Sequence, residues 1–415
     1  MISIVDGIRK ATDIAALLCL AAGYSTAFAS EARTCPVHVL SRTNSVGIMQ
    51  LKDGDTRVHL ADPFVERDAN GRIRVYGTSN DEYLEYSSER ALFAGAPPVH
   101  RKITFKHPDG TRLNARETPW DTLPFSCGTK SFLFSGVMTP PPASQHATFP
   151  DDNRRRRTYV FTPARNDPSV FVRSEKPLLP GDADSWIGHN YGHDFIRNEN
   201  GKPVRNADGS YTLVYERVTR FSDKGKLITE IASRPLRCPN LDVGNEKLLL
   251  RIDDENPWPA VQRNDGGLLI EGPRVMKMRR NNRDIYVMGF SSGDFPTDHY
   301  GINLAFSFEP DGPYSPVLTE DGKDLRDFGR ELRQLYGLSW GPARPDFYRD
   351  RRGKLWLAFH ALEKKDYPGA NFDRWPGNPH GYHRGIFLVP FQVQLHRGQP
   401  EFHVGEVECG KLGVN

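Results

Sequence analysis

The chain has 415 residues, enough for one large all-β domain or two ordinary domains. Its formal net charge of +3 is too small to indicate a nucleic-acid partner. Two local basic runs, at 154–157 and 277–283, lack interleaved stacking aromatics, so we interpret them as solvated turns.

The first 29 residues have the pattern of a secretory signal peptide. Arg9 and Lys10 precede the apolar run IAALLCLAAG, and Ala-Phe-Ala at 27–29 supplies a small-x-small cleavage site. The run is short for a membrane span, and a buried N-terminal helix is the alternative. We therefore expect removal of residues 1–29 and a single catalytic domain over 30–415, secreted or periplasmic, with no membrane contact after processing.

Cleavage would leave an even number of cysteines, which suits two disulfides in an oxidising compartment. They are Cys35, Cys127, Cys238 and Cys409. The sequence does not choose among the three pairings, although a bond between Cys35 and Cys409 would tie the two mature ends together. No cysteine spacing indicates a zinc site.

Hairpin-like segments recur along the chain. Each has an Asp beside a Phe, a charged turn ending in Gly, and a strand of apolar residues; they lie at 62–77, 193–216 and 344–361. The segment 268–293 has the same shape, with RNNRD as its turn and IYVMGF as its second strand. This pattern predicts β-hairpins.

The spacing of the hairpins predicts a radial repeat. The interval from Asp62 to Asp194 is nearly twice the later intervals, so a further unit is expected there, with strands at 131–138 and 158–164. That gives five units of roughly 65–80 residues, longer than the usual ~40–50. One helix is expected, at 324–337. The fold class predicted is all-β, a five-bladed β-propeller.

Three acidic residues occupy comparable places in different units. They are Asp62, Asp194 and Glu271, the last between an apolar strand end and Gly272-Pro273. Because the innermost strands of a propeller line one channel, equivalent positions meet at one mouth. We expect the three carboxylates to converge there.

These motifs resemble those of the five-bladed glycoside hydrolases of family 43 and its clan. The segments that carry the resemblance are ADPFVERDANGRIRVYGTS, GHDFIRNENG, IEGPRVMK and DHYGINLAFSFEPDGPYSPV. They cover most of the mature chain in patches, and their order and spacing are more specific than any one of them.

The resemblance implies a catalytic set. Asp62 would be the general base, Glu271 the general acid, and Asp194 the residue that orients the acid. An inverting pair stands ~6.5–9.5 Å apart, which leaves room for a water molecule. Asp62 has another reading, as a turn starter before Pro63. Asp184 is the alternative to Asp194, because the family has Pro where this chain has Phe195.

Aromatic and polar residues near these motifs are candidate substrate-binding groups. They are Trp120, Trp186, Tyr191, His193, His299, Trp340 and Arg344. Aromatic rings form platforms for sugars, but they also fill the interfaces between blades. His193 has the second reading of an inter-blade histidine.

The last hairpin departs from the family pattern. The family often has Gly-x-Gly-His there, with the His near a bound metal ion or water, whereas this chain has WGPARPDFYRD with Arg344. That departure puts a structural calcium ion in question. We predict no metal ligands and no required cofactor.

The sequence thus predicts a secreted hydrolase of arabinose- or xylose-containing plant or microbial polysaccharides, with carbohydrate as its partner. Two alternatives stay open. One is a non-catalytic carbohydrate-binding propeller. The other is a retaining fructosyl hydrolase or transferase of related fold, with the two carboxyl groups ~5–5.5 Å apart and Asp62 as nucleophile.

Overall fold

The computed structural model describes the greater part of the chain. The ranges are 38–39, 61–78, 81–94, 96–114, 117, 119–138, 156–179, 190–221, 227–251, 269–293, 299–336, 338–363 and 385–404. All lie in one compact unit, Pro36–Gly405. The expected signal peptide, Cys35, Cys409, Asp184 and Trp186 fall outside the described residues. Within these ranges no helix has the length and apolar character needed to cross a membrane.

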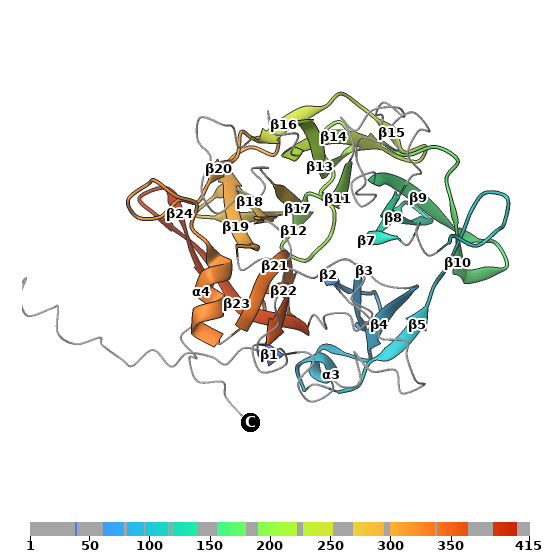
Figure 1. Cartoon of the computed structure of the whole chain (residues 1–415), viewed down its shortest axis with the longest axis horizontal. Helices are drawn as coiled ribbons and strands as arrows, with labels where there is room; N and C mark the ends of the chain where they lie inside the picture. The colour runs from blue at the N-terminus through green and yellow to red at the C-terminus, as the bar shows by residue number, and fades with distance from the viewer. Residues whose placement is uncertain are drawn as a thin grey trace, which may run out of the picture. The chain divides into compact units, whose positions relative to one another are not determined.

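Five small, mostly antiparallel sheets stand around a common centre (Figure 1). The first contains β2 (Ala61–Arg67), β3 (Ile73–Thr78), β4 (Glu82–Tyr86) and β5 (Val99–Lys102), with α3 (Glu89–Phe93) after β4. The second contains β7 (Trp120–Cys127), β8 (Lys130–Met138), β9 (Arg156–Ala164), β10 (Asp167–Arg173) and β6 (Thr104–Lys106). The third contains β11 (Asn190–Phe195), β13 (Tyr211–Phe221), β14 (Leu227–Arg237), β15 (Asp242–Val243) and β16 (Lys247–Leu250).

The remaining two sheets complete the ring. The fourth contains β12 (Arg197–Asn198), β17 (Ile270–Arg280), β18 (Arg283–Ser292), β19 (Gly301–Ser307) and β20 (Ser315–Pro316). The fifth contains β21 (Leu338–Arg349), β22 (Leu355–Glu363), β23 (Gly385–His396), β24 (Gln399–Val404) and β1 (His38–Val39). The architecture is a five-bladed β-propeller, and the predicted fold class is confirmed.

One turn chemistry explains the recurring hairpins. The side-chain oxygens of Asp68, Asn198 and Asp350 each accept hydrogen bonds from the backbone N–H groups two and four residues later, at 2.8–3.1 Å. The Gly three residues after each has a positive φ, which a Gly adopts without a steric cost. The repeated pattern of an acidic or amide residue followed by Gly therefore marks real strand-to-strand turns.

The expected helix also forms, over α4 (Phe328–Tyr336), four residues later than predicted. Asp327 explains where it begins, because its Oδ1 accepts a hydrogen bond from the Arg330 backbone N–H at 2.8 Å. A side-chain oxygen in this place satisfies a donor that the first helical turn leaves unpaired.

The core lies between adjacent sheets. Phe125 of β7 and Phe195 of β11 stack with ring centroids 4.2 Å apart, both nearly fully buried. Burying one such side chain stabilises the fold by about 1.5–3 kcal/mol. A disulfide from Cys127 at the end of β7 to Cys238 just after β14 adds a covalent link between the second and third sheets.

A short pairing closes the ring. β1 pairs antiparallel with β23, His38 opposite Leu388 and Val39 opposite Phe387. A segment from early in the chain thus completes the sheet made by its last strands.

Candidate active site

In each sheet, the strand nearest the propeller axis departs from regular pairing at an equivalent position. A register shift there accompanies a residue with φ between 51° and 60°. These residues are Asp62, Asp121, Gly192, Gly272 and Arg344. Positive φ costs a non-glycine residue about 1–2 kcal/mol. Bulges and strained residues cluster at functional sites, so the three non-glycine positions mark one end of the channel as a candidate site.

Arg344 of β21 binds two carboxylates at once. Its Nε donates to Oδ1 of Asp62 at 3.0 Å, and its Nη2 donates to Oδ2 of Asp121. Thr78 bridges the same pair, because its hydroxyl donates to Oδ2 of Asp62 and accepts from the Asp121 backbone N–H at 3.1 Å. Asp62 and Asp121 are therefore fixed side by side.

This cluster is almost closed to solvent. Asp62 and Arg344 are 5% exposed and Asp121 is 1% exposed. Burial raises the pKa of Asp121; the Arg344 charge opposes that rise, and the Asp62 charge adds to it. Burial alone would lower the pKa of Arg344, but Asp121 and Asp62 raise it well above its usual range. The guanidinium stays charged between the two acids.

Glu271 belongs to the same cluster. It lies on β17 one residue before the bulge position, and the Tyr300 hydroxyl donates a hydrogen bond to its Oε1. Its charge acts on Asp121, Arg344 and Tyr300. A Cβ on the next residue, Gly272, would lie 1.9 Å from Nη1 of Arg344. Only a glycine lets Arg344 pass this closely under the strand that carries Glu271.

His360 of β22 lies behind Asp62. Its Nδ1 accepts a hydrogen bond from the Asp62 backbone N–H at 3.0 Å, which places the proton of the neutral ring on Nε2. The Tyr300 ring packs against the His360 ring, with centroids 6.1 Å apart and planes 25° apart. Tyr300 thus contacts both the residue that supports Asp62 and the side chain of Glu271.

Asp194 is placed elsewhere. It lies two residues beyond the bulge glycine, Gly192, and so one level deeper in the channel than Asp62 and Asp121. Its Oδ2 accepts from Nη2 of Arg197 at 2.9 Å, and Arg197 also binds Asp346. The structure therefore brings Asp121, rather than the predicted Asp194, beside Asp62. Gly192, and not Asp194, occupies the place in the third sheet that Asp62 occupies in the first. The predicted equivalence of Asp62 and Asp194 is therefore wrong.

Apart from Trp186, which lies outside the described residues, the predicted substrate-binding residues differ in their surroundings. Half-buried Trp120 precedes Asp121, and exposed His299 precedes Tyr300. Tyr191 and Trp340 are described by their backbones alone, on β11 and β21. His193 is fully buried against Phe134 and Thr158 of the second sheet. Its contacts are those of the inter-blade histidine that the sequence left as an alternative.

Sequence reasoning missed Asp121, Thr78, Tyr300 and His360. For Asp121 a signal existed: an Asp precedes an apolar strand in WDTLPF as it does in ADPFV, about one repeat length after Asp62. No comparable signal marks the other three, because their roles depend on contacts between sheets.

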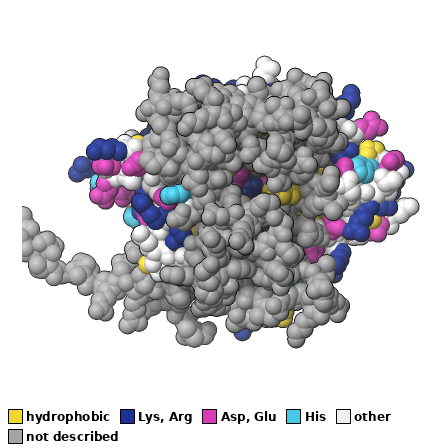
Figure 2. Space-filling model, in the orientation of Figure 1, with side chains coloured by type: hydrophobic (Ala, Val, Ile, Leu, Met, Phe, Trp, Pro, Cys, Tyr) yellow, Lys and Arg dark blue, Asp and Glu magenta, His cyan; other side chains and the backbone are white. Residues whose placement is uncertain are grey.

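Figure 2 views the propeller along the axis of Figure 1 and shows acidic and basic side chains near the middle of this face. Across the described ranges, no group of three or more His, Cys, Asp or Glu side chains is arranged to hold a metal ion.

Neither a protein-family model nor a curated protein matches the chain by sequence. Solved structures do match by shape. A thermostable family-43 glycoside hydrolase is 14% identical with a TM-score of 0.54, over 87% of this chain and 97% of that one. An α-L-arabinofuranosidase from Lactobacillus brevis is 13% identical with a TM-score of 0.55, over 83% and 93%.

An endo-arabinase from Bacteroides thetaiotaomicron VPI-5482 is 13% identical, with a TM-score of 0.50, over 82% of this chain and 96% of that one. Identities this low establish shape and not activity. The chain therefore has the five-bladed propeller fold of the family-43 glycoside hydrolases.

Proposed function

We propose that the protein is a secreted glycoside hydrolase that cleaves arabinose- or xylose-type bonds in plant or microbial polysaccharides with inversion at the anomeric carbon. The observation that carries the proposal is the single cluster of buried Asp62, Asp121 and Arg344 with half-buried Glu271. The neighbours named arabinofuranosidase and endo-arabinase support the choice of sugar.

Asp62 has the surroundings of a general base. Ion pairing with Arg344 stabilises a carboxylate at this position, and hydrogen bonds from Arg344 and Thr78 anchor both of its oxygens. As general base, Asp62 would accept a proton from a water molecule as that water attacks the anomeric carbon. Tight anchoring keeps the carboxylate in one orientation through the reaction.

Glu271 has the complementary role of general acid. Its proton would pass to the glycosidic oxygen as the bond to the anomeric carbon breaks, and Tyr300 would stabilise the carboxylate left behind. Asp121 and Arg344 lie beside both Asp62 and Glu271 and keep the two proposed reacting groups in a fixed arrangement. Nη1 of Arg344 and Oδ1 of Asp121 are buried and have no hydrogen-bond partner among the described residues.

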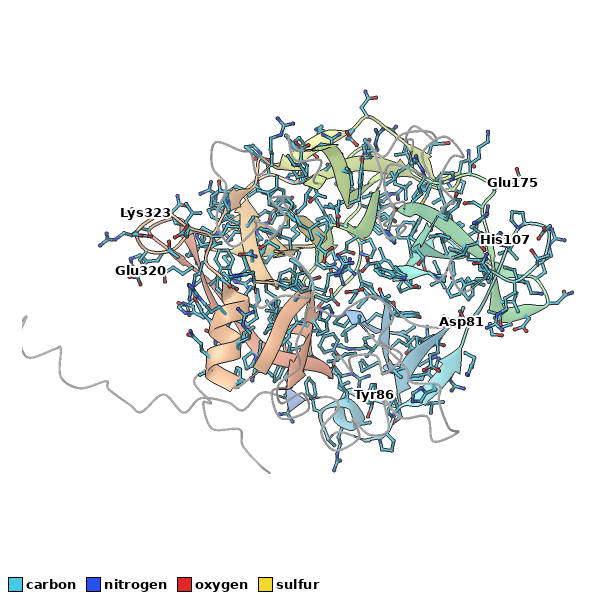
Figure 3. The ribbon with its side chains drawn as sticks, viewed as in Figure 1. Asp81, Tyr86, His107, Glu175, Glu320 and Lys323 are labelled. Atoms are coloured by element: carbon cyan, nitrogen blue, oxygen red, sulfur yellow. A yellow bond between two sulfur atoms is a disulfide. The ribbon has the colours of Figure 1, made fainter. Side chains whose placement is uncertain are left out.

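The test is a panel of aryl α-L-arabinofuranosides and β-D-xylosides with three variants. We expect Glu271→Gln and Asp62→Asn each to lower kcat/KM on the preferred substrate by about 10²–10⁴-fold. The matched control is Glu320→Gln, an exposed residue at the outer edge of the molecule in Figure 3, and its activity should equal that of the parent protein.

The products distinguish the alternatives. If the enzyme inverts, NMR of the first-formed sugar will show the anomeric configuration opposite to that of the substrate. Retention would replace this mechanism with the fructosyl-type reaction in which Asp62 is the nucleophile. Binding of glycans without turnover would indicate a non-catalytic propeller, and normal turnover by Glu271→Gln would remove Glu271 from the mechanism.

A further inference from the structure

A second concavity lies at the other end of the channel. It is a cavity of about 420 Å³, within the range of small-molecule sites. Four of the five central strands lead to it from the catalytic cluster, since β2, β7, β11 and β21 each pass their bulge before they reach its lining. All of its lining residues are described.

A layer of buried charge lies between this cavity and the catalytic cluster. Arg197 bridges Asp194 and Asp346, with Asp194 and Asp346 0% exposed and Arg197 4% exposed. Asp194 and Arg197 also line the cavity. A ligand in the cavity would therefore meet this charged layer and not Asp62.

The walls combine aromatic faces with polar edges. Tyr76, Phe171, Tyr211 and Tyr348 are among the aromatic residues, and exposed Lys202, Ser126 and Ser131 stand at the opening. Ligands that are apolar on their faces and polar at their edges suit such a lining.

Three further guanidinium groups of the lining pair with carboxylates of the protein. Arg67 pairs with Glu89 at 2.6 Å, Arg349 with Glu199 at 2.6 Å, and Arg74 with Asp68 at 3.2 Å. Guanidinium groups already engaged by carboxylates have little remaining attraction for an anion. Glu66 and Lys202 add an acceptor and a donor at half-buried and exposed positions. The lining thus favours an uncharged ligand rich in both donors and acceptors.

We propose that this cavity binds a neutral sugar unit, at the end or on a side branch of a glycan, as a second attachment point for polysaccharide. A cavity of this volume accommodates one or two sugar rings. The choice of arabinose and xylose as probes rests on the proposed function, whereas the site itself rests on the cavity.

The test fills the cavity from its rim. Ser131→Trp places a large ring at an exposed lining position, and the matched control Lys130→Trp changes the adjacent exposed residue, which does not line the cavity. Both are made in the full-length Glu271→Gln protein, in which we expect turnover to be about 10²–10⁴-fold slower. Isothermal titration calorimetry with arabino- and xylo-disaccharides and trisaccharides then counts the sites.

We expect one sugar site fewer in Ser131→Trp than in Lys130→Trp. In the otherwise unaltered enzyme, Ser131→Trp should leave kcat/KM for a small aryl glycoside unchanged and raise KM for polysaccharide about tenfold. Lys202→Ala offers a milder change and should weaken the same site several-fold. Equal site counts in the two Trp variants, or displacement of sugar by inorganic phosphate, would overturn the proposal.

The outcome is separable from that of the proposed function. An enzyme that hydrolyses the aryl glycosides but shows no cavity-dependent binding disproves this inference alone. A protein that hydrolyses nothing, yet loses one sugar site in Ser131→Trp, disproves the proposed function and leaves this site standing.

Discussion

The Tyr300 hydroxyl donates a hydrogen bond to Oε1 of Glu271, across 29 residues of sequence. The same ring packs on His360, whose Nδ1 accepts from the Asp62 backbone. One buried tyrosine therefore contacts one proposed reacting group, Glu271, and the histidine that supports the other, Asp62.

We predict that Tyr300→Phe lowers kcat/KM by about 10- to 100-fold, because a hydrogen bond to a charged group contributes about 1.5–3 kcal/mol. Phe keeps the ring beside His360, so the fold should be retained. Steady-state kinetics on the preferred aryl glycoside check the loss. Tyr286→Phe, on β18 away from the cluster, is the matched control; an equal loss there would show a general packing effect.

Arg344→Met should destabilise the protein by about 3–5 kcal/mol, because it removes the cation that binds two adjacent buried carboxylates. Urea denaturation at neutral pH measures the change. The exposed pair of Arg237 and Asp208 provides the control, and Arg237→Met should cost at most about 1 kcal/mol. Similar losses in the two variants would contradict the bridging role of Arg344.

Gly272→Ala should displace Arg344 and reduce activity about 10²-fold, since its Cβ would lie 1.9 Å from Nη1 of Arg344 and small misplacements near reacting groups are costly. Gly322→Ala separates this clash from backbone strain. Gly322 also has a positive φ, 72°, but no atom lies within 4 Å of an added Cβ. Steady-state kinetics measure both variants, and circular dichroism checks that they fold. Equal losses of activity in the two variants would show that the contact between Gly272 and Arg344 is not the cause.

His193 should make the fold sensitive to acid. Burial lowers its pKa to about 3, and nearby Arg274 adds to the effect, whereas an unfolded chain titrates near 6.5. A depressed pKa contributes stability that is present above pH 6.5 and is lost as the pH falls toward 3. We expect roughly 3 kcal/mol of this loss by pH 4.

His193→Phe should remove this part of the acid dependence, as measured by urea denaturation at pH 8 and pH 4. Exposed His403 provides the comparison, and His403→Phe should leave the difference between the two pH values unchanged. If His193→Phe keeps the full acid sensitivity, another group causes it.

Most of the fold could be predicted from the sequence, because the hairpins that build the sheets are local patterns. Turns at Asp68, Asn198 and Asp350 use the same hydrogen bonds, so residue spacing alone revealed the hairpins. Asp62 and Glu271 were predicted in one pocket, and the structure places them in one cluster. The catalytic roles of both stay predictions.

The third carboxylate was missed although the sequence held a signal for it. Asp62 and Gly192 each lie six residues before a turn residue, Asp68 or Asn198, whereas Asp194 lies only four residues before Asn198. Asp194 was matched with Asp62 because each stands close before a Phe, and Asp121 was overlooked. Tyr300 and His360 meet across two sheets, and no local pattern encodes such a contact.

The pairing of Val39 with Phe387 also has a consequence for biosynthesis. The first-made partner leaves the ribosome long before the second, by tens of seconds at translation rates of about 5–20 residues per second. Throughout that interval β1 has no partner strand, because β23 has not yet been synthesised. Closure of this toroid therefore depends on the arrival of the carboxyl-terminal portion.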